Sequence, residues 1–186
     1  MTTAGLVLAA GAGVRFGGPK APVVVDGERL VDRAARLLRE AGCDPVLVVL
    51  GAWLGEVPGA DAIVENPDWS EGMGSSLRVG LEALEALERV DDVVVTLVDL
   101  PGLTAPAVRR IVAAPGGIAI AAYDGERGHP VRLPRTHWAG VRAAARGDAG
   151  ARDYLRGRTD IALIEVGDVA SGEDLDTPVA DPAERS

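Results

Sequence analysis

The sequence predicts an α/β fold, a three-layer α/β/α and Rossmann-like arrangement around a mostly parallel sheet. Short apolar runs rich in β-branched residues alternate along the chain with longer stretches whose leucines and alanines recur at helical spacing. Such alternation is typical of parallel sheets covered by helices. The chain has 186 residues, of which 47% are hydrophobic, so it is long enough to bury a sizeable core. We therefore expect residues 1–186 to form one domain.

Each predicted element rests on a local pattern. The strands are continuous apolar runs, which we place at 6–10, 46–50, 62–65, 93–98, 118–122 and 161–166. The helices carry apolar residues three and four positions apart, and we place them at 28–41, from about 75, around 108–112 and over 136–155. Gly42 ends the first helix, Gly147 interrupts the last, and Asp26-Gly27 marks a turn. Ligands of such sheets bind beyond the carboxyl ends of the strands, so the residues at those ends are the candidates for chemistry.

The composition excludes several classes of function. The formal net charge is -9, which argues against a nucleic-acid partner, because such proteins present a basic face. Acidic residues gather from Glu165 onward, and we expect most of them to be solvated, with a metal ligand among them as the alternative. We expect an acidic C-terminal tail from about residue 179. The single Cys43 permits no internal disulfide and is expected to be buried. No signal peptide or membrane-length apolar run is present, so we expect no membrane partner and a cytoplasmic location.

A glycine-rich loop follows the first predicted strand. Gly11 and Gly13 let the backbone turn and let its amides approach a ligand closely. Arg15 and Lys20 are the only charged side chains before Asp26, so this part of an acidic chain is locally cationic. A cationic loop rich in amide donors suits a polyphosphate, and we interpret it as a nucleotide triphosphate site.

Two better-known glycine loops do not match. In the dinucleotide-binding pattern G-x-G-x-x-G the last glycine is replaced by Phe16. In the P-loop pattern Pro19 separates Gly18 from Lys20, and Ala21 stands where a hydroxyl is needed. From the spacing alone, a turn whose glycines serve only packing remains the alternative.

The loop resembles the signature of a known family. Residues 8–20 read L-A-A-G-x-G-x-R-x-G-x-P-K, which is similar to the nucleotidyltransferases of the MobA-like family, and within it to the molybdenum cofactor cytidylyltransferases. The resemblance implies a nucleotide-diphospho-sugar transferase type of sheet and a cytidine nucleotide, because cytidylyl-transferring members carry L-A-A-G. It implies catalytic roles for Arg15 and Lys20. The nucleotide contacts that it implies here are Leu8, Ala9, Ala10, Gly11, Gly13 and Lys20.

Two acidic motifs suggest a metal site. Asp99 follows a buried strand and precedes a proline turn, which places a hard oxygen ligand for Mg²⁺ at a strand's carboxyl end; a turn or N-cap aspartate fits the spacing equally well. The resemblance favours the metal, because the family's V-D-x-P aspartate is a metal ligand and is counted among its catalytic residues. Residues 174–178 match the family's D-x-D-T-P, which implies Asp176 as second ligand, with Asp174 sharing the role or solvated.

A third motif, G-M-G-S-S-L-R, occupies residues 72–78. Taken alone it predicts a helix with Ser75 as its N-cap. In the family this segment lies beside the base and ribose, which implies nucleotide contacts from Asn66, Gly74 and Ser75. Arg78 either faces the acceptor or pairs with a neighbouring acid.

The last motifs lie on the acceptor side by resemblance. Residues 128–131 read G-H-P-V and residues 147–152 read G-D-x-G-A-R, which implies acceptor contacts from His129 and Arg152. A lone histidine is more often structural, and Asp148 fits equally well as the N-cap of a following helix. No nucleophile elbow is present, so a covalent mechanism is not expected.

Together the motifs imply a Mg²⁺-dependent transfer of CMP from CTP to the terminal phosphate of molybdenum-molybdopterin, with release of pyrophosphate. The product would pass to a molybdoenzyme or its maturation chaperone. Two alternatives remain: a guanylyl- or other nucleotidyltransferase, using GTP for example, on a different phosphorylated acceptor, and a non-catalytic nucleotide- or cofactor-binding protein.

Overall fold

The computed structural model describes residues 2–177 of the chain. Its centre is a seven-stranded sheet in the order β5-β4-β1-β6-β8-β7-β9. Strand β8 runs antiparallel to both of its neighbours, and the other neighbouring strands are parallel. The expected mostly parallel α/β sheet is therefore confirmed, whereas the expected acidic tail from about residue 179 lies outside the described residues.

The elements have the following bounds. The sheet strands are β1 (Thr3–Leu8), β4 (Val46–Leu50), β5 (Ala62–Glu65), β6 (Asp92–Leu97), β7 (Ile118–Tyr123), β8 (Glu126–Pro134) and β9 (Ile161–Glu165). A small hairpin is formed by β2 (Val24–Val25) and β3 (Glu28–Arg29). The helices are α1 (Leu30–Glu40), α2 (Met73–Glu85), α3 (Ala105–Val112), α4 (Arg135–Ala144) and α5 (Arg152–Leu155), with 3₁₀ turns η1 (Trp69–Glu71) and η2 (Gly147–Ala149).

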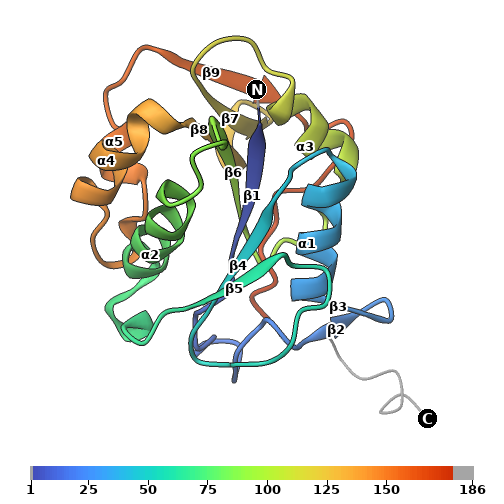
Figure 1. The fold of residues 1–186 in the computed structure, drawn as a ribbon. Coiled ribbons are helices and arrows are strands. Elements are labelled where there is room, and N and C mark those ends of the chain that lie inside the picture. Colours follow the sequence, from blue (N-terminus) through green and yellow to red (C-terminus); the bar gives the residue numbers. More distant parts are fainter. Residues whose placement is uncertain (1, 178–186) are drawn as a thin grey trace.

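The helices cover both faces of the sheet. Figure 1 shows α1 and α3 on one side and α2, α4 and α5 on the other. Successive side chains of a strand point to opposite faces, so Val7 of β1 packs in the cluster under α1 and α3, while Leu6 and Leu8 pack in the cluster under α2 and α4. Each face of the sheet is thus sealed by its own apolar core, which leaves the strand ends as the places where polar groups can gather.

Strand β8 is the main departure from the predicted fold. The predicted strands include none between residues 122 and 136. Strand β8 contains two prolines and three charged residues, unlike the continuous apolar runs from which the other strands were predicted. The turn at Asp124 and Gly125, both with positive φ, reverses the chain after β7, and Val131 of β8 then pairs with Val95 of β6. Because β8 runs antiparallel, its first residues lie beside the carboxyl ends of its neighbours.

Three smaller expectations are corrected. Helix α2 begins at Met73 and is preceded by Gly72, so Ser75 is not its N-cap; the Ser75 hydroxyl donates back to the carbonyl of Gly72 at 2.8 Å. Asp148 lies in η2 and does not cap α5, which has no side-chain cap. The first helix begins later than expected, because residues 28 and 29 pair in the β2–β3 hairpin around the Asp-Gly turn.

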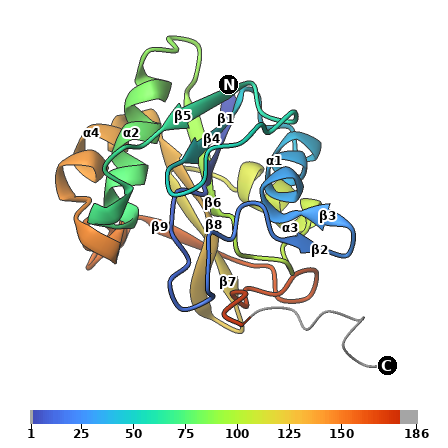
Figure 2. The ribbon, with the colours of Figure 1, turned by 90° about the horizontal axis from the view of Figure 1, so that it is seen from below.

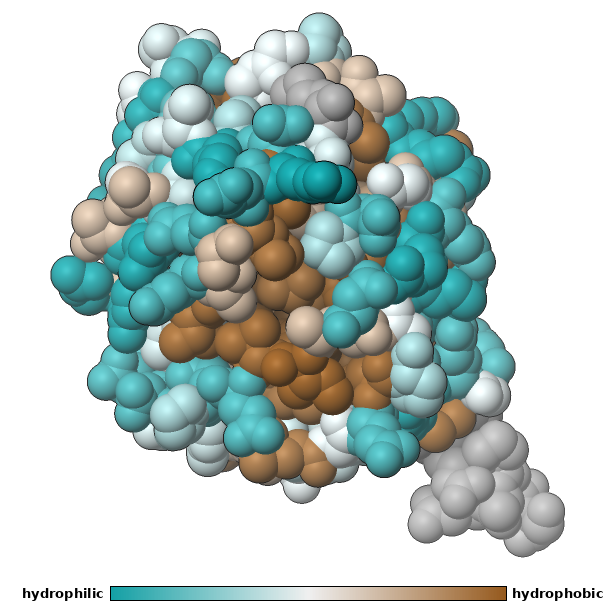
Figure 3. Space-filling view, in the orientation of Figure 1, coloured by the Kyte–Doolittle hydropathy of each residue, from teal (hydrophilic) through white to brown (hydrophobic). Residues whose placement is uncertain are grey.

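Three further features concern the core and the surface. Cys43 is buried, and burial raises the pKa of its thiol to about 12, which keeps it protonated. Edge strand β5 leaves Ile63 41% exposed, and Figure 3 shows apolar side chains gathered over the region of β4 and β5. Between residues 2 and 177, no helix combines the length and the apolar character that crossing a bilayer requires.

Candidate functional site

The candidate site lies at the carboxyl ends of β1 and β6. These strands pair in register to their last residues, Leu8 and Leu97, so the segments that follow them leave the sheet side by side. The glycine loop (residues 9–20) follows β1, and Asp99 follows β6 after one further residue. Figure 2 looks from below onto this end of the sheet, which is where open α/β sheets bind ligands.

The glycine loop folds tightly around Gly13. Its φ is +57°, and a Cβ there would lie 2.0 Å from the Gly18 carbonyl oxygen, so only glycine fits. The amides of Gly17 and Gly18 both donate to the Gly13 carbonyl, at 2.9 and 3.1 Å. The loop then turns back to deliver Lys20, whose side chain is only 15% exposed.

Lys20 joins the loop to the carboxylates. Its Nζ donates to Asp99 Oδ2 at 2.8 Å and lies 3.8 Å from Asp176 Oδ1. The structure thus brings together three of the predicted site residues, which come from three distant parts of the sequence.

The segment after β9 delivers Asp176. We call residues 166–176 the C-terminal strap. Its Leu175 amide donates to the Asp99 carbonyl at 2.9 Å, and its Ser171 amide donates to the Gly102 carbonyl at 3.1 Å. A further anchor is the Asp168 carboxylate, which accepts two bonds from Arg110 of α3. Asp168 is therefore part of an ordered contact, unlike the solvated tail expected for most acidic residues of this region.

The electrostatics of this corner favour a cation. Burial raises the pKa of Asp174, and the neighbouring carboxylates of Asp99 and Asp176 raise it further, while Lys20 acts in the opposite direction. Within residues 2–177, no three acidic, histidine or cysteine side chains converge as a ready metal site. The oxygen donors of Asp99 and Asp176 suit a hard divalent cation whose remaining positions are filled by phosphate oxygens of a ligand and by water.

Two adjoining cavities open here, and they share the lining residues Leu8, Met73 and Leu97. The first, the loop cavity, measures about 380 Å³. Its lining includes the predicted nucleotide contacts Leu8, Ala10, Gly11, Gly13 and Lys20, and the predicted metal ligand Asp99. The second, the β8 cavity, measures about 600 Å³. Its polar lining includes Arg127, His129, Arg152, Arg156 and Asp174. Lys20 and Asp99 line the first cavity and Asp174 lines the second, so these groups stand where the two cavities meet. Asp176 lines neither cavity, and its carboxylate lies 3.8 Å from Lys20 Nζ.

His129 carries a buried nitrogen without a partner at the β8 cavity. Its Nδ1 is buried without a hydrogen-bond partner in the described part of the chain. Burial lowers the pKa of His129, against the opposing effects of the Val95 carbonyl and Asp99, so the ring is neutral near pH 7. A neutral imidazole with an unused nitrogen is suited to hydrogen bonding with a ligand rather than to charge pairing.

Several residues predicted for the site lie elsewhere. Asn66 and Ser75 are buried, and the Asn66 amide donates to the Ser75 and Ser76 hydroxyls at 2.8 and 3.0 Å. A Cβ on Gly74 would lie 2.8 Å from the backbone nitrogen of Arg146, so this glycine serves close packing. None of these groups except Ser76 lines either cavity, and their predicted ligand contacts remain predictions.

Four more predicted residues lie outside both cavity linings, and one of them is Asp176 of the C-terminal strap. Ala9 is buried, and its amide donates to the Val49 carbonyl at 2.9 Å. Arg15 is exposed on the glycine loop. Arg78 forms an ion pair with Glu71 at 2.8 Å and also donates to the Ala145 carbonyl. Of the two predicted roles for Arg78, the structure shows the pairing with a neighbouring acid.

The structure also adds residues that the motifs did not single out. Trp69 and Met73 line the loop cavity, and Arg127 and Arg156 line the β8 cavity. Met73 lies inside the 72–78 motif, so that motif marked the right segment but not the side chain that faces the cavity. The two arginines are ordinary exposed cations in the sequence, and only the placement of β8 and α5 reveals them.

Comparisons with known proteins agree with this geometry. The model of the MobA-like NTP transferase domain matches residues 5–163. Over 189 residues the chain is 40% identical to the nicotine blue oxidoreductase of Paenarthrobacter nicotinovorans, and the match covers 93% of this chain and 91% of that protein.

Solved structures give the same picture. The crystal structure of Rv0371c from Mycobacterium tuberculosis H37Rv has a TM-score of 0.77 at 26% identity and covers 95% of this chain and 93% of that one. Rv0371c has also been solved in complex with manganese, a structure 24% identical to this chain with a TM-score of 0.71 that covers 89% of each chain. A nucleotidyl transferase from Methanothermobacter thermautotroptrophicus shares the fold, with a TM-score of 0.72 at 21% identity over 89% of this chain and 87% of that one. This chain belongs to the MobA-like NTP transferase domain family, which supports the predicted class of enzyme, a nucleotidyltransferase.

Proposed function

We propose that the protein transfers CMP from CTP to the terminal phosphate of a molybdopterin-type acceptor and releases pyrophosphate. The observation that carries this proposal is the position of Lys20, Asp99 and Asp174 at the junction of two cavities, with Asp176 3.8 Å from Lys20. A transferase needs two substrate sites that meet at the reacting atoms, and two cavities meet at this end of the sheet. The proposal takes residues 1–186 as one domain.

In this proposal the loop cavity holds the nucleotide. The amides of the glycine loop and the Lys20 ammonium are donors suited to a triphosphate. Arg15 is exposed on the same loop and would contact the phosphates of a bound nucleotide. The base assignment rests on the Leu8-Ala9-Ala10-Gly11 sequence, which resembles cytidylyl-transferring relatives, and GTP is the alternative nucleotide.

Asp99 and Asp176 would hold a divalent cation together with phosphate oxygens of the substrates. When bound, the cation supplies charge neutralisation and orientation of the phosphates. Mg²⁺ is the proposed cation, and the manganese complex of Rv0371c makes Mn²⁺ a useful second probe.

The reaction then depends on positioning and charge. An oxygen of the acceptor phosphate forms a bond to the α-phosphorus of CTP, the bond from that phosphorus to the bridging oxygen breaks, and pyrophosphate leaves with the electron pair. The nucleophile is already anionic, so no general base is needed. Lys20 would offset the negative charge that develops on the phosphates.

The β8 cavity would hold the acceptor. His129 offers a neutral, unpartnered nitrogen, and Arg127 and Arg152 offer cationic groups at the same cavity. Its larger volume, about 600 Å³, is in the range that encloses a small-molecule ligand.

The test is pyrophosphate release with CTP or GTP, Mg²⁺ and freshly prepared molybdenum cofactor, with the Asp99→Asn variant as blank. Release that depends on CTP and is lost in the variant would support the nucleotide and acceptor together. Release with GTP alone would replace the nucleotide assignment and keep the chemistry. Binding of both nucleotides without any release would contradict the proposed acceptor or favour a non-catalytic binding protein.

A second candidate function comes from the relative that is 40% identical and is named an oxidoreductase. On this alternative the same cavities would hold a reducing cofactor and an oxidisable or reducible small molecule. The glycine loop departs from the dinucleotide-binding pattern at Phe16, which argues against it. Oxidation of NADH or NADPH by the purified protein in the presence of nicotine blue, without pyrophosphate release in the first assay, would favour this alternative.

A further inference from the structure

We propose that Tyr123 is a positioning residue for the acceptor side of the site: it fixes the wall that carries His129 relative to the C-terminal strap that carries Asp174 and Asp176. The inference rests on the proposed function, because it assigns Tyr123 to the placing of an acceptor against those carboxylates. Tyr123 ends β7 and is not itself among the residues that line the β8 cavity.

The Tyr123 ring is in close contact with two glycines, both at its Cδ2–Cε2 edge. A Cβ on Gly128 of β8 would lie 2.8 Å from the ring, and a Cβ on Gly172 of the strap would lie 2.7 Å from it. Real side chains do not approach so closely, so both segments are in contact with the ring only because each presents a bare backbone. The two glycines also line the β8 cavity, so the ring lies directly behind its wall.

The Tyr123 hydroxyl fixes the next residue of β8. It donates to the His129 carbonyl at 2.7 Å, which is a short and well-formed hydrogen bond. Burial raises the pKa of Tyr123, with the charge of Glu165 adding to the effect, so the phenol keeps its proton and remains a donor at neutral pH.

The C-terminal strap connects the Tyr123 contact at Gly172 with the carboxylates of Asp174 and Asp99. Two residues beyond Gly172 the chain reaches Asp174, which lines the same cavity, and the following Leu175 amide bonds to the Asp99 carbonyl at 2.9 Å. One aromatic side chain therefore touches both the segment proposed to hold the acceptor and the segment proposed to hold the cation.

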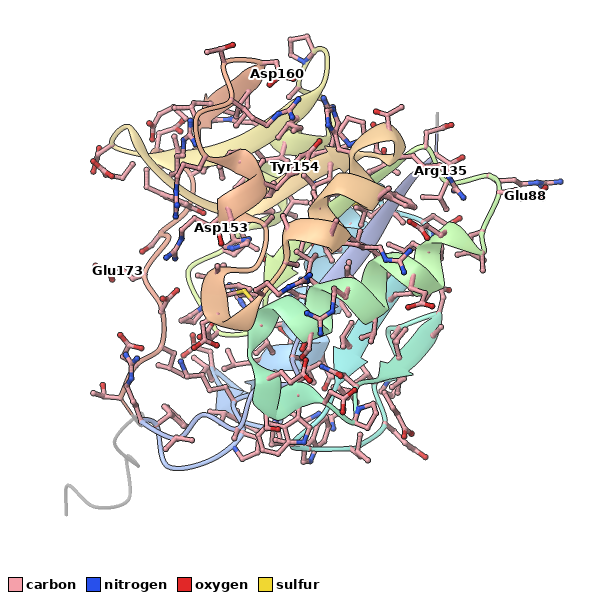
Figure 4. The ribbon with its side chains drawn as sticks, turned by 90° about the vertical axis from the view of Figure 1, so that its left-hand side faces the viewer. Glu88, Arg135, Asp153, Tyr154, Asp160 and Glu173 are labelled. Carbon is pink, nitrogen blue, oxygen red and sulfur yellow. The ribbon has the colours of Figure 1, made fainter. Side chains whose placement is uncertain are left out.

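The chain supplies a matched control. It contains two tyrosines and two histidines, and each tyrosine hydroxyl bonds to a different histidine. Tyr154, labelled in Figure 4, lies in the helical layer and bonds to His137 Nδ1 at 2.9 Å. Its ring also packs on a glycine, since a Cβ on Gly140 would lie 2.5 Å away. Tyr154→Phe thus removes the same hydroxyl from a similar setting, at a residue outside both cavity linings.

The experiment compares Tyr123→Phe and Tyr154→Phe in the full chain by proton NMR of the two histidine rings and by steady-state kinetics. We expect Tyr123→Phe to move the His129 signal only, and to raise the acceptor KM by about three- to tenfold, the scale of one net hydrogen bond, at unchanged kcat and CTP KM. Tyr154→Phe should move the His137 signal only and leave the kinetics unchanged.

Gly172→Ala tests the other contact of the ring. Its Cβ should displace the strap and lower kcat by about tenfold to a hundredfold, the scale of a misplacement near 1 Å. The proposal is overturned if Tyr123→Phe leaves the His129 signal and the acceptor KM at wild-type values. If the wild-type protein transfers no nucleotide to any acceptor offered, the proposed function fails instead, and the histidine signals alone then decide for or against the placement of His129 by Tyr123.

Discussion

Strand β6 has an aspartate at each end, and the two lie in opposite environments. Asp92, its first residue, is 2% exposed, and its Oδ1 has no hydrogen-bond partner among the described residues. Asp99, just beyond its last residue, is paired with Lys20 at 2.8 Å and lines the loop cavity. The same residue type is thus sealed into the fold at one end of the strand and accessible to a ligand at the other.

The arginines near these ends show the same contrast. At the amino end, Arg132 donates to four backbone carbonyls at 2.6–2.9 Å, and Arg135 donates to three at 2.6–2.9 Å. At the carboxyl end, Arg127 and Arg152 line the β8 cavity and make no ion pair or hydrogen bond through their side chains within residues 2–177. The arginines at the amino end hydrogen-bond to the backbone and stabilise the fold, whereas Arg127 and Arg152 at the carboxyl end remain available to a ligand. This difference favours the carboxyl end as the substrate site.

The largest effect is expected from the same substitution made at the two ends. Asp99→Asn should abolish metal-dependent nucleotidyl transfer, a loss of about 10³-fold or more, because it removes a carboxylate from the proposed cation site. Asp92→Asn should leave turnover unchanged. Pyrophosphate release measures both, and circular dichroism checks that each variant is folded. Full activity in Asp99→Asn would remove the metal assignment.

A somewhat smaller loss is expected for Lys20→Ala. Turnover should fall by about 10²-fold, the scale of losing one oriented charge that stabilises the transition state. Because the Lys20 ammonium neutralises Asp99 in the ligand-free protein, the variant should also bind Mn²⁺ more tightly than wild type without nucleotide. A loss of less than about threefold in turnover would exclude Lys20 from the mechanism.

The sequence predicted the sheet well where strands are buried on both faces. Such strands are continuous β-branched runs, as at 46–50 and 92–97, and their periodicity needs no knowledge of the neighbours. It failed for β8, in which the charge of Arg132 is buried because its guanidinium donates to four carbonyls 15 to 20 residues away in sequence. These hydrogen bonds form only in the folded chain, so no local sequence pattern predicts them.

The site was predictable in the same uneven way. The glycine loop and Asp99 are each marked by a strand end, and the structure places both at one cavity. Asp176 was reached only through family resemblance, because nothing local to the strap says that it crosses to Asp99. In the 72–78 motif Ser75 was wrongly predicted as the N-cap, because the helix begins at Met73. The side chains of the motif that line a cavity are those of Met73, Ser76 and Leu77, which its sequence alone does not distinguish.

Among the arginines, Arg152→Ala should raise the acceptor KM by about three- to tenfold, because an exposed cation contributes modestly and is screened by salt. The matched control is Arg156→Ala, since Arg156 lines the same cavity but is already paired with Asp153 at 2.8 Å. KM measured at low and at high salt should show a larger difference between wild type and Arg152→Ala at low salt. Equal effects of the two substitutions would mean that an unpaired arginine has no special role at this cavity.

The smallest effect is expected at the amino end, and it concerns stability. Burial raises the pKa of Asp92, while the charge of Arg132 opposes the shift and that of Asp91 adds to it. Because the folded pKa lies above the unfolded one, the contribution of Asp92 to stability is complete below about pH 4 and is lost as the pH rises through the folded pKa.

Asp92→Asn replaces the carboxylate by a neutral group, so its free energy of unfolding should exceed that of wild type at pH 7 and approach it in acid. Urea unfolding of both proteins across this pH range measures the difference. If the variant is instead less stable at pH 7, attraction between Asp92 and Arg132 outweighs the cost of burying the charge. In that case the charge of each aspartate, Asp92 and Asp99, is stabilised by a neighbouring cation. Access to a cavity is then what distinguishes Asp99 from the buried Asp92.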